Sequence, residues 1–354
     1  MNFLENEIIL NDLKEIHKSN INWNKLQNKK IMITGAYGML ASYLVYELIY
    51  QNEKYQRNIT IIAVVKNKDK LNERFGVYTQ KKYFKTLISD LTDKIKYKED
   101  VDYIIHAASF ASAEYYSTIP VQVLEPNTIG TYNLLNFAKN KNIKGMLFLS
   151  TGNIYGLVSG KKYLAEEDYG SLSTLDAHSC YEESKRMGET LFKSYYTQYN
   201  LPTRIVRIFH AYGPTMDIND PRVFSSFTRD VINKQDIQMK SEGLAKRSFC
   251  YITDIITGFL TILLEGEDGE AYNLCNTQQF ISIIDLANIM VNIFPERGLK
   301  VIKVKRDENE NYIEYHSNDE IIPCNRKLEK LGWKANITCH EGFKRVIKAQ
   351  EMKK

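Results

Sequence analysis

Tyr181 and Lys185 stand four residues apart, and together their side chains could move a proton. In a helix, positions i and i+4 lie on one face, so the lysine ammonium would sit beside the tyrosine phenol. A nearby positive charge lowers the pKa of a phenol and helps it exchange a proton with an alcohol or carbonyl oxygen. The pair therefore indicates oxidation or reduction at a carbon–oxygen centre. Tyr50 and Lys54 share the spacing, so the surrounding motifs must carry the argument.

The composition is that of an ordinary globular chain. Its 354 residues are 44% hydrophobic and 25% charged, which suits one large or two closely joined domains. The net charge of +4 is small and evenly spread, so we expect no nucleic-acid and no membrane partner. No leader-like or membrane-spanning segment is found, which predicts a cytoplasmic location. The five cysteines form no metal spacing with the six histidines, so we expect free thiols and no metal site.

Strands and helices alternate along most of the chain, which predicts an α/β fold with a Rossmann-type doubly wound parallel sheet. Apolar runs typical of buried strands cover 30–34, 59–65, 83–88, 103–105, 145–149 and 203–208. Residues 1–28 have apolar positions at helical spacing and would form an amino-terminal helical extension. Residues 29–211 would be the dinucleotide-binding domain. Residues 212–354, with a charged stretch near 304–320, would form a smaller carboxy-terminal α+β domain that binds the substrate and is interleaved with the first.

A glycine-rich turn follows the first strand and opens a helix. Gly35 permits the tight turn, Gly38 lets the backbone approach a pyrophosphate, and Ala41 keeps the third position small. This strand–turn–helix context predicts a dinucleotide site. The tip of the second strand carries Lys66 and Lys68 where a carboxylate would select NAD. These cations would pair with a 2′-phosphate, so NADP(H) is favoured and NAD(H) stays possible; the alternative is that the lysines are merely solvated.

With these motifs and those that follow, the chain resembles the extended short-chain dehydrogenase/reductases that act on nucleotide sugars. The resemblance extends over residues 28–350. Its matching blocks include Thr34–Ala41, Asp90-Leu91, His106–Ser109, Asn127–Thr131, Leu149–Gly156, Arg207–Pro214, Arg222–Phe224, Arg247–Asp254 and Leu331–Trp333.

The resemblance implies a role for each matching position. Thr151 would hydrogen-bond the reacting sugar oxygen, Tyr181 would be the acid/base, and Lys185 would support it and hold the nicotinamide ribose. The cofactor would also be lined by Gly35, Tyr37, Gly38, Met39, Leu40, Lys66, Asp90, Leu91, Ala107, Ala108, Ser109 and Asn127. The substrate would contact Ser109, Asn153, His210, Arg222, Val223 and Arg247. Guanidinium groups suit a diphosphate, although surface ion pairs stay open for the two arginines and a satisfied structural role for His210.

Two positions depart from the dehydratases and decarboxylases of this family. Those enzymes carry acids where this chain has Gly152 and Asn153, and neither residue can exchange a proton near neutral pH. The sequence therefore predicts NADPH-dependent reduction of a nucleotide-linked 4-keto-6-deoxyhexose, of the dTDP-4-dehydro-6-deoxyglucose reductase type, for surface polysaccharide. The alternative is a nucleotide-sugar 4-epimerase or UDP-glucuronate decarboxylase-like enzyme with retained NAD. A non-catalytic cofactor-sensing protein is a minor alternative.

The resemblance also implies partners. The small-molecule partner would be a nucleotide-diphosphate sugar. Family members commonly pair the helix that carries the catalytic tyrosine across a two-fold axis, so we expect a homodimer. In this chain the apolar positions expected at that contact are Met187, Leu191 and Phe192.

Overall fold

The computed structural model describes residues 3–305 and 320–352. Within them, seven parallel strands form one sheet in the order β12-β7-β5-β4-β1-β2-β3. The order reverses between β1 and β4, where doubly wound sheets bind dinucleotides. This confirms the predicted Rossmann-type α/β fold. The strands are β1 (Lys30–Thr34), β2 (Thr60–Val65), β3 (Phe84–Ile88), β4 (Tyr103–His106), β5 (Gly145–Thr151), β7 (Thr203–Ile208) and β12 (Glu270–Leu274).

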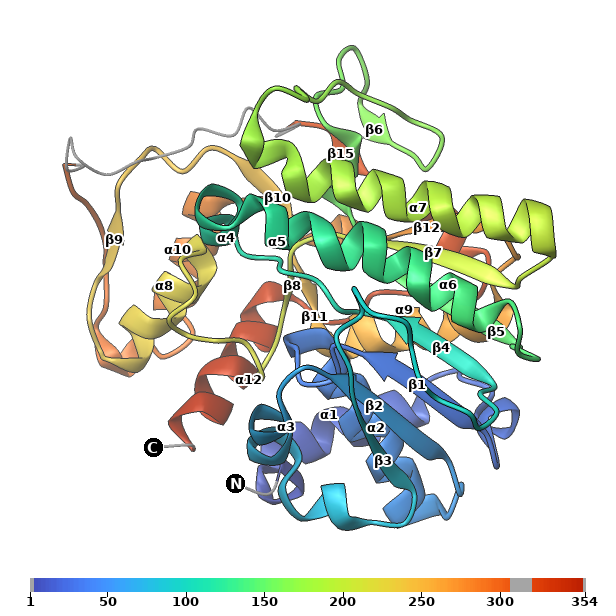
Figure 1. Cartoon of the computed structure of the whole chain (residues 1–354). Helices are drawn as coiled ribbons and strands as arrows, with labels where there is room; N and C mark the ends of the chain where they lie inside the picture. The colour runs from blue at the N-terminus through green and yellow to red at the C-terminus, as the bar shows by residue number, and fades with distance from the viewer. Residues whose placement is uncertain (1–2, 306–319, 353–354) are drawn as a thin grey trace.

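Helices cover both faces of this sheet (Figure 1). Strands such as β5 are buried along their whole length, because their continuous apolar runs meet helices on either side. One face carries α1 (Glu7–Lys18), α2 (Met39–Tyr55), α3 (Lys68–Phe75) and α9 (Ile252–Glu265). The other carries α4 (Ala113–Thr118), α5 (Pro120–Glu125), α6 (Thr131–Ala138) and α7 (Cys180–Tyr199), the helix that begins with the Tyr181 segment.

The amino-terminal extension forms the expected helix, α1, and packs against α2, α9 and α12 (Cys339–Glu351). Its buried Asp12 accepts hydrogen bonds from Tyr43 and, at 2.7 Å, from Tyr251. Arg345 on α12 pairs with the same carboxylate at 2.8 Å. Because these partners come from distant parts of the chain, α1 is an integral layer of the fold.

Several carboxy-terminal elements lie beyond one end of the sheet, on the left in Figure 1, among them α8 (Val223–Ile232), β9 (Ile237–Met239) and α10 (Ile283–Val291). Strand β12 lies beyond residue 211 yet pairs with β7 in the main sheet, so the two predicted parts are interleaved. The smaller elements are α8 (Val223–Ile232), α10 (Ile283–Val291), α11 (Arg326–Glu329), and the paired strands β6 (Tyr163–Leu164) with β15 (Ile322–Pro323), β8 (Ala211–Tyr212) with β11 (Cys250–Tyr251), β9 (Ile237–Met239) with β14 (Val301–Lys303), and β10 (Lys246–Ser248) with β13 (Phe280–Ser282).

Two sequence observations remain, one on the charged stretch near 304–320 and one on membrane-spanning segments. Most of the charged stretch near 304–320 lies outside them. Among the helices that the structure does describe, none combines the length and the apolar character that crossing a membrane would require.

Candidate active site

The glycine loop brings the end of β1 against the end of β4. Gly35 has φ +64°, and a Cβ on it would lie 2.8 Å from Cα of Ala108, so only glycine suits this backbone and this space. Gly38 is the N-cap of α2 and places no side chain over the amides of the first helical turn. Those amides and the positive helix end suit a pyrophosphate. The loop thus fits a dinucleotide, and it carries the half-buried side chains of Tyr37, Met39 and Leu40.

The lysine expected to read a 2′-phosphate is paired within the protein. Lys66 Nζ lies 2.8 Å from Oδ2 of Asp90, which follows β3, next to the buried Leu91. Burial opposes the ionised form of Asp90, but Lys66 and the amide of Thr92 outweigh it and lower the pKa of this carboxyl. Lys68 is exposed as the first residue of α3. Lys66, the lysine on which the NADP(H) prediction mainly rested, therefore forms an ion pair with Asp90 of the predicted cofactor site.

Hydrogen bonds hold the residues after β4 beside the glycine loop. Thr34 Oγ1 lies 2.8 Å from His106 Nδ1 and accepts the amides of Ala107 and Ala108 at 3.1 and 3.2 Å. Burial lowers the pKa of His106 to about 3, so its ring is neutral. These bonds fix the predicted cofactor-lining backbone at 107–108 against the loop.

Two buried polar atoms of predicted cofactor residues are unsatisfied. Asn127 lies in a π-helical turn (Pro126–Gly130), a feature frequent at functional sites, and its amide donates to Ser184 Oγ at 3.0 Å. Across the described residues, neither Asn127 Oδ1 nor Ser109 Oγ has a hydrogen-bond partner. Buried polar atoms are rarely left unpaired, so both fit a role in holding a ligand.

The predicted catalytic hydroxyls lie close together. Thr151 ends β5 and Tyr181 lies in the first turn of α7, near enough for the Thr151 hydroxyl to lower the pKa of the phenol against the larger effect of burial. The ring of Tyr116 stacks on that of Tyr181 at 4.9 Å between centroids and 12° between planes. The phenol is therefore fixed on two sides, as a positioned acid/base requires.

The expected electrostatic effect of Lys185 on Tyr181 is wrong in this arrangement. Lys185 Nζ donates to the carbonyl of Leu149 at 2.7 Å and lies 5.8 Å from the centre of the Tyr181 ring. Burial lowers the pKa of Lys185 to about 7. Burial also raises the pKa of Tyr181 to about 12, and the charge of Glu182 adds to this. Desolvation thus has the largest effect on the pKa of both groups. The i+4 spacing predicted that the two side chains share a helix face, but it carried no information on their burial.

The position that follows Thr151 lies against an aromatic ring. A Cβ on Gly152 would lie 2.5 Å from the ring of Phe209, so any larger residue there would require this ring to shift. Asn153 is exposed, and its side-chain amide donates to Oε1 of Glu182 at 3.4 Å. A carboxyl group therefore lies beside position 153 after all, supplied by α7.

His210 is half-buried near the predicted substrate residues. Its φ is +22°, an uncommon value for a non-glycine residue, and its Nδ1 has no partner in residues 3–305 and 320–352. Burial, followed by the charges of Arg247 and Arg222, lowers the pKa of His210 to about 3, so the ring is neutral. The interpretation of a satisfied structural histidine is wrong, and the ring remains a candidate substrate contact.

The two predicted phosphate arginines differ in their surroundings. Arg222, just before Val223 and α8, makes a two-point contact with Asp220 at 2.8 and 2.9 Å. Arg247 lies on β10 and donates to the carbonyl of Lys246 at 2.7 Å. Arg222 thus forms the ion pair that the sequence left open. Both arginines lie close enough to His210 to shift its pKa.

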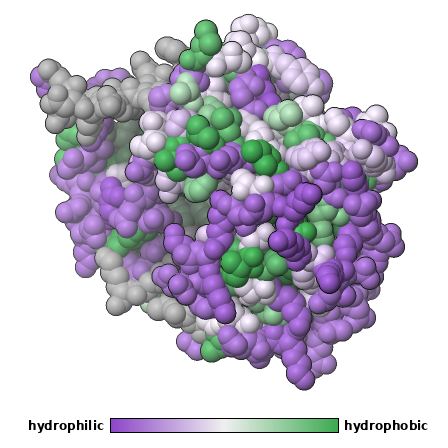
Figure 2. Space-filling view, in the orientation of Figure 1, coloured by the Kyte–Doolittle hydropathy of each residue, from purple (hydrophilic) through white to green (hydrophobic). Residues whose placement is uncertain are grey.

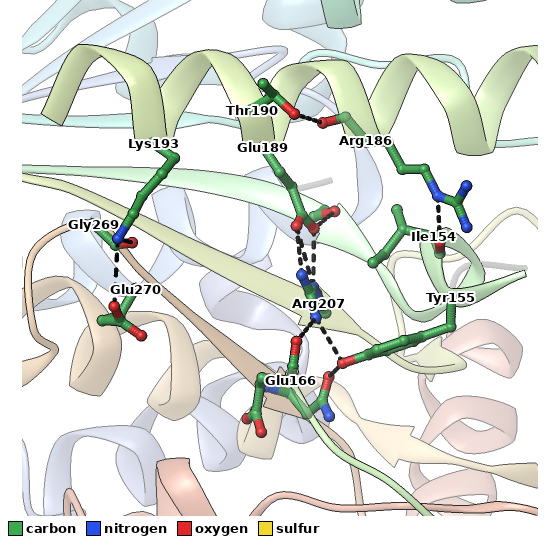
Figure 3. A network of polar contacts seen from close by, with 12 residues as sticks. Ile154, Tyr155, Glu166, Arg186, Glu189, Thr190, Lys193, Arg207, Gly269 and Glu270 are labelled. Atoms are coloured by element: carbon green, nitrogen blue, oxygen red, sulfur yellow. Dashed lines mark hydrogen bonds and ion pairs between the residues drawn. The ribbon is translucent and has the colours of Figure 1, made fainter. Parts of the chain in front are cut away.

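A buried ion pair anchors α7 to the sheet (Figure 3). Arg207 on β7 contacts Glu189 on α7 at 2.8 Å, and it donates to Tyr155 Oη at 2.9 Å and to the carbonyl of Glu166 at 2.7 Å. Burial opposes the arginine charge, but Glu189 outweighs it and raises the pKa of Arg207. Ser150 donates to the same glutamate at 2.5 Å. The network fixes the helix that carries Tyr181 and Lys185 relative to the ends of β5 and β7.

The structure thus places Thr151, at the end of β5, close to Tyr181 and Lys185 on α7; their catalytic roles stay a prediction. Sequence reasoning assigned no role to Tyr116, Phe209 or Glu182. No spacing marks Tyr116 or Phe209, because both reach the site through tertiary packing, whereas Glu182 adjoins Tyr181 in the sequence and its burial was not foreseen.

The sequence comparisons identify the family. The model of the "NAD dependent epimerase/dehydratase family" matches residues 31–275. UDP-glucuronic acid decarboxylase 6 of Arabidopsis thaliana is 31% identical over 319 residues, which cover 89% of this chain and 87% of that protein. UDP-glucuronic acid decarboxylase 1 of Xenopus tropicalis is 28% identical and covers 90% of this chain and 71% of its own length.

Solved structures share the fold. The epimerase Mth375 of Methanothermobacter thermautotrophicus superposes with a TM-score of 0.77 at 19% identity, over 97% of this chain and 95% of its own. WbmF of Bordetella bronchiseptica in complex with NAD+ gives 0.73 at 21% identity, over 93% and 94%. With the glycine loop, the buried hydroxyl pair and the family match over most of the chain, the protein is an enzyme of the NAD dependent epimerase/dehydratase family.

Proposed function

We propose that this enzyme oxidises C4 of a nucleoside-diphosphate sugar with a tightly held NAD and returns the hydride in the same site. UDP-glucuronate decarboxylation is the first candidate reaction. A 4-epimerisation that uses the same retained NAD is the alternative within this proposal. The observation that carries the proposal is the buried pair Thr151 and Tyr181, in a fold whose first strand ends in a loop shaped for a pyrophosphate. The 31% identity to a UDP-glucuronic acid decarboxylase supports the same reading over the reductase that the sequence favoured.

Each residue of the site has a separate role in the proposed reaction. A bound nicotinamide supplies the hydride acceptor. Tyr181 exchanges a proton with the C4 oxygen, and Thr151 positions that oxygen by its hydroxyl. The Lys185 ammonium is a hydrogen-bond donor on the same helix as the phenol. Asn127 Oδ1 and Ser109 Oγ are unpaired polar atoms that can orient the ligands. Because Tyr181 is buried, water is kept from the reacting oxygen.

The cofactor proposed is NAD rather than NADP. Lys66 is paired with Asp90, so a 2′-phosphate would have to compete with a carboxylate for that cation. Solved relatives are described with NAD, among them WbmF and the dTDP-glucose 4,6-dehydratase DesIV of Streptomyces venezuelae.

A second candidate is the NADPH-dependent reductase of a 4-keto-6-deoxy sugar nucleotide. The observation that favours it is the pair Gly152 and Asn153, which leaves the end of β5 without the acids of decarboxylases and dehydratases. Reduction of a ready-made ketone needs one hydride and one proton, and Tyr181 suffices for the proton.

One experiment separates the two candidates. The purified enzyme is expected to release NAD on denaturation, and to convert UDP-glucuronate to a UDP-pentose and CO2, or to its 4-epimer, with no nicotinamide added. Chromatography of the nucleotides identifies both the cofactor and the product. NADPH consumption with dTDP-4-keto-6-deoxyglucose, and no turnover of UDP-sugars, would instead establish the reductase.

We also propose a homodimer formed through α5, α6 and α7. Figure 2 shows hydrophobic side chains gathered over this layer. Four exposed apolar residues lie on these helices and the turn between them: Val121, Ile129, Tyr132 and Met187, each about half-exposed. Phe192, expected at the contact, is fully buried beside Phe148 in the core, so it does not contribute. Apolar area of this kind is typical of a surface that a partner covers.

Light scattering at micromolar concentration is expected to give twice the mass of one chain. Met187→Glu should shift the protein toward the monomer, because a charge would be buried at the contact. Met352→Glu is the matched control, since Met352 is 46% exposed against 48% for Met187 but lies at the far end of α12. A monomeric wild type, or equal effects of both changes, would refute this interface.

A further inference from the structure

Glu182 carries a buried carboxyl group that its surroundings leave half-satisfied. The residue is 3% exposed in the first turn of α7. Its Oε1 accepts a long hydrogen bond of 3.4 Å from Asn153, and its Oε2 has no partner anywhere in the described residues. An unpaired carboxylate oxygen is costly inside a protein, so its retention calls for an explanation.

Two other buried acids of this fold are paired with cations, whereas Glu47 on α2 resembles Glu182 in having a buried Oε2 without a partner among the described residues. Asp12 is bound by two tyrosines and Arg345, and Glu189 is bound by Arg207. Glu182 has no such cation in contact among the described side chains. Burial raises its pKa, and the charges of Asp176 and Glu183 raise it further against the hydrogen bond from Asn153. The environment therefore favours a neutral carboxyl that can give up a proton, as a general acid does.

Glu182 also lies next to the catalytic hydroxyls. The backbone amide of Asn153 donates to Thr151 Oγ1 at 3.2 Å, and the Thr151 hydroxyl lies near enough to Tyr181 to lower the pKa of its phenol. The side chain of Asn153 thus joins Glu182 to the group that holds the C4 oxygen. The Phe209 ring packs against Gly152, so in this structure the acid near Asn153 comes from α7.

We propose that Glu182 exchanges a proton with C5 of the substrate sugar, in place of an acid at the end of β5. This rests on the proposed C4 oxidation, because a ketone at C4 is what makes C5 reactive. In decarboxylation the C5–C6 bond breaks, CO2 leaves, and the bonding electrons pass into the C4–C5 enolate. Glu182 then gives its proton to C5, and the carboxylate left behind regains a proton from solvent before the next turnover.

The test separates the two steps with Glu182→Gln, which keeps the shape and the hydrogen bond to Asn153. With UDP-glucuronate in heavy water, the bound nicotinamide of the wild type should become reduced transiently, and the product should carry deuterium at C5. In Glu182→Gln the reduction should still occur, because Thr151 and Tyr181 are intact. The formation of C5-labelled product should fall at least about 100-fold, and the nicotinamide should stay reduced.

Glu183→Gln is the matched control, since Glu183 is the next residue on α7, is one-third exposed and pairs with Arg186 at 3.3 Å. It should label C5 at the rate of the wild type. Asn153→Glu added to Glu182→Gln should restore part of the labelling, which a purely structural role of Glu182 would not allow. Thermal melting should place Glu182→Gln at or above the wild type, because the change removes an unpaired buried carboxyl.

The outcomes are distinguishable. If the wild type reduces its nicotinamide but gives no C5 label, or if Glu182→Gln labels C5 at the normal rate, the role of Glu182 is overturned and the C4 oxidation stands. If no nucleotide sugar reduces the nicotinamide of the wild type, the proposed function fails, and this inference fails with it.

Discussion

Tyr181→Phe is expected to lower turnover at least about 100-fold while the protein still folds and binds its cofactor. The change removes the proton that the site exchanges with the C4 oxygen but keeps the ring. Stacking on Tyr116 at 4.9 Å therefore survives, and the loss to stability is limited to the polar interactions of one hydroxyl, about 1 kcal/mol or less. Steady-state rates with the substrate identified above, together with thermal melting, check both parts.

Tyr199→Phe serves as the control for this experiment. Tyr199 is the last residue of the same helix and is 45% exposed, so loss of its hydroxyl should leave both turnover and melting unchanged. A Tyr181→Phe enzyme within tenfold of the wild-type rate would mean that another group holds the C4 proton. Glu182 would then be the first residue to examine, because it is the nearest carboxyl on α7.

The central strands could be read from the sequence because each is a continuous apolar run. The ranges 30–34 and 203–208 agree with β1 and β7 at both ends. The run 145–149 was too short, since β5 continues through the polar Ser150 and Thr151. That extension matters, because it makes Thr151 the last residue of the strand and fixes its hydroxyl opposite α7.

Strand β12 could not be predicted, for a physical reason. Its segment Glu270–Leu274 begins with an acid and contains Asn273, so it lacks the apolar run of a central strand. It lies at the edge of the sheet and pairs only with β7, where one side needs no partner strand. Asn273 is nevertheless buried, because its amide binds the carbonyls of Leu164 and Cys324.

The residue types of the site were predictable, but their energetics were not. The spacing of Tyr181 and Lys185 predicted one helix face, which α7 provides. It did not reveal that both side chains are buried. Burial raises the pKa of Tyr181, where a lowering by Lys185 was expected. Burial depends on contacts such as that of Tyr116, which lies 65 positions earlier in the chain and is brought in by α4.

The second large effect, a loss of stability, is expected when the buried ion pair between Glu189 and Arg207 that anchors α7 is broken. Glu189→Gln is expected to destabilise the protein by about 3 kcal/mol, because it leaves the buried guanidinium of Arg207 without its counter-charge. The side chains of this pair are only 6% and 11% exposed, so solvent cannot replace the lost carboxylate. Urea unfolding followed by fluorescence measures the loss, and turnover should fall as well, since the helix that carries Tyr181 is held by this pair.

Glu183→Gln, on the same helix, breaks the Glu183–Arg186 pair, whose side chains are about one-third exposed. It should cost less than about 1 kcal/mol, because water already solvates both charges. Replacing both members of the buried pair, as Glu189→Leu with Arg207→Met, should recover much of the stability lost in Glu189→Gln, since no unpaired charge remains. Equal losses in Glu189→Gln and Glu183→Gln would show that Tyr155 and the Glu166 carbonyl alone can hold the Arg207 charge.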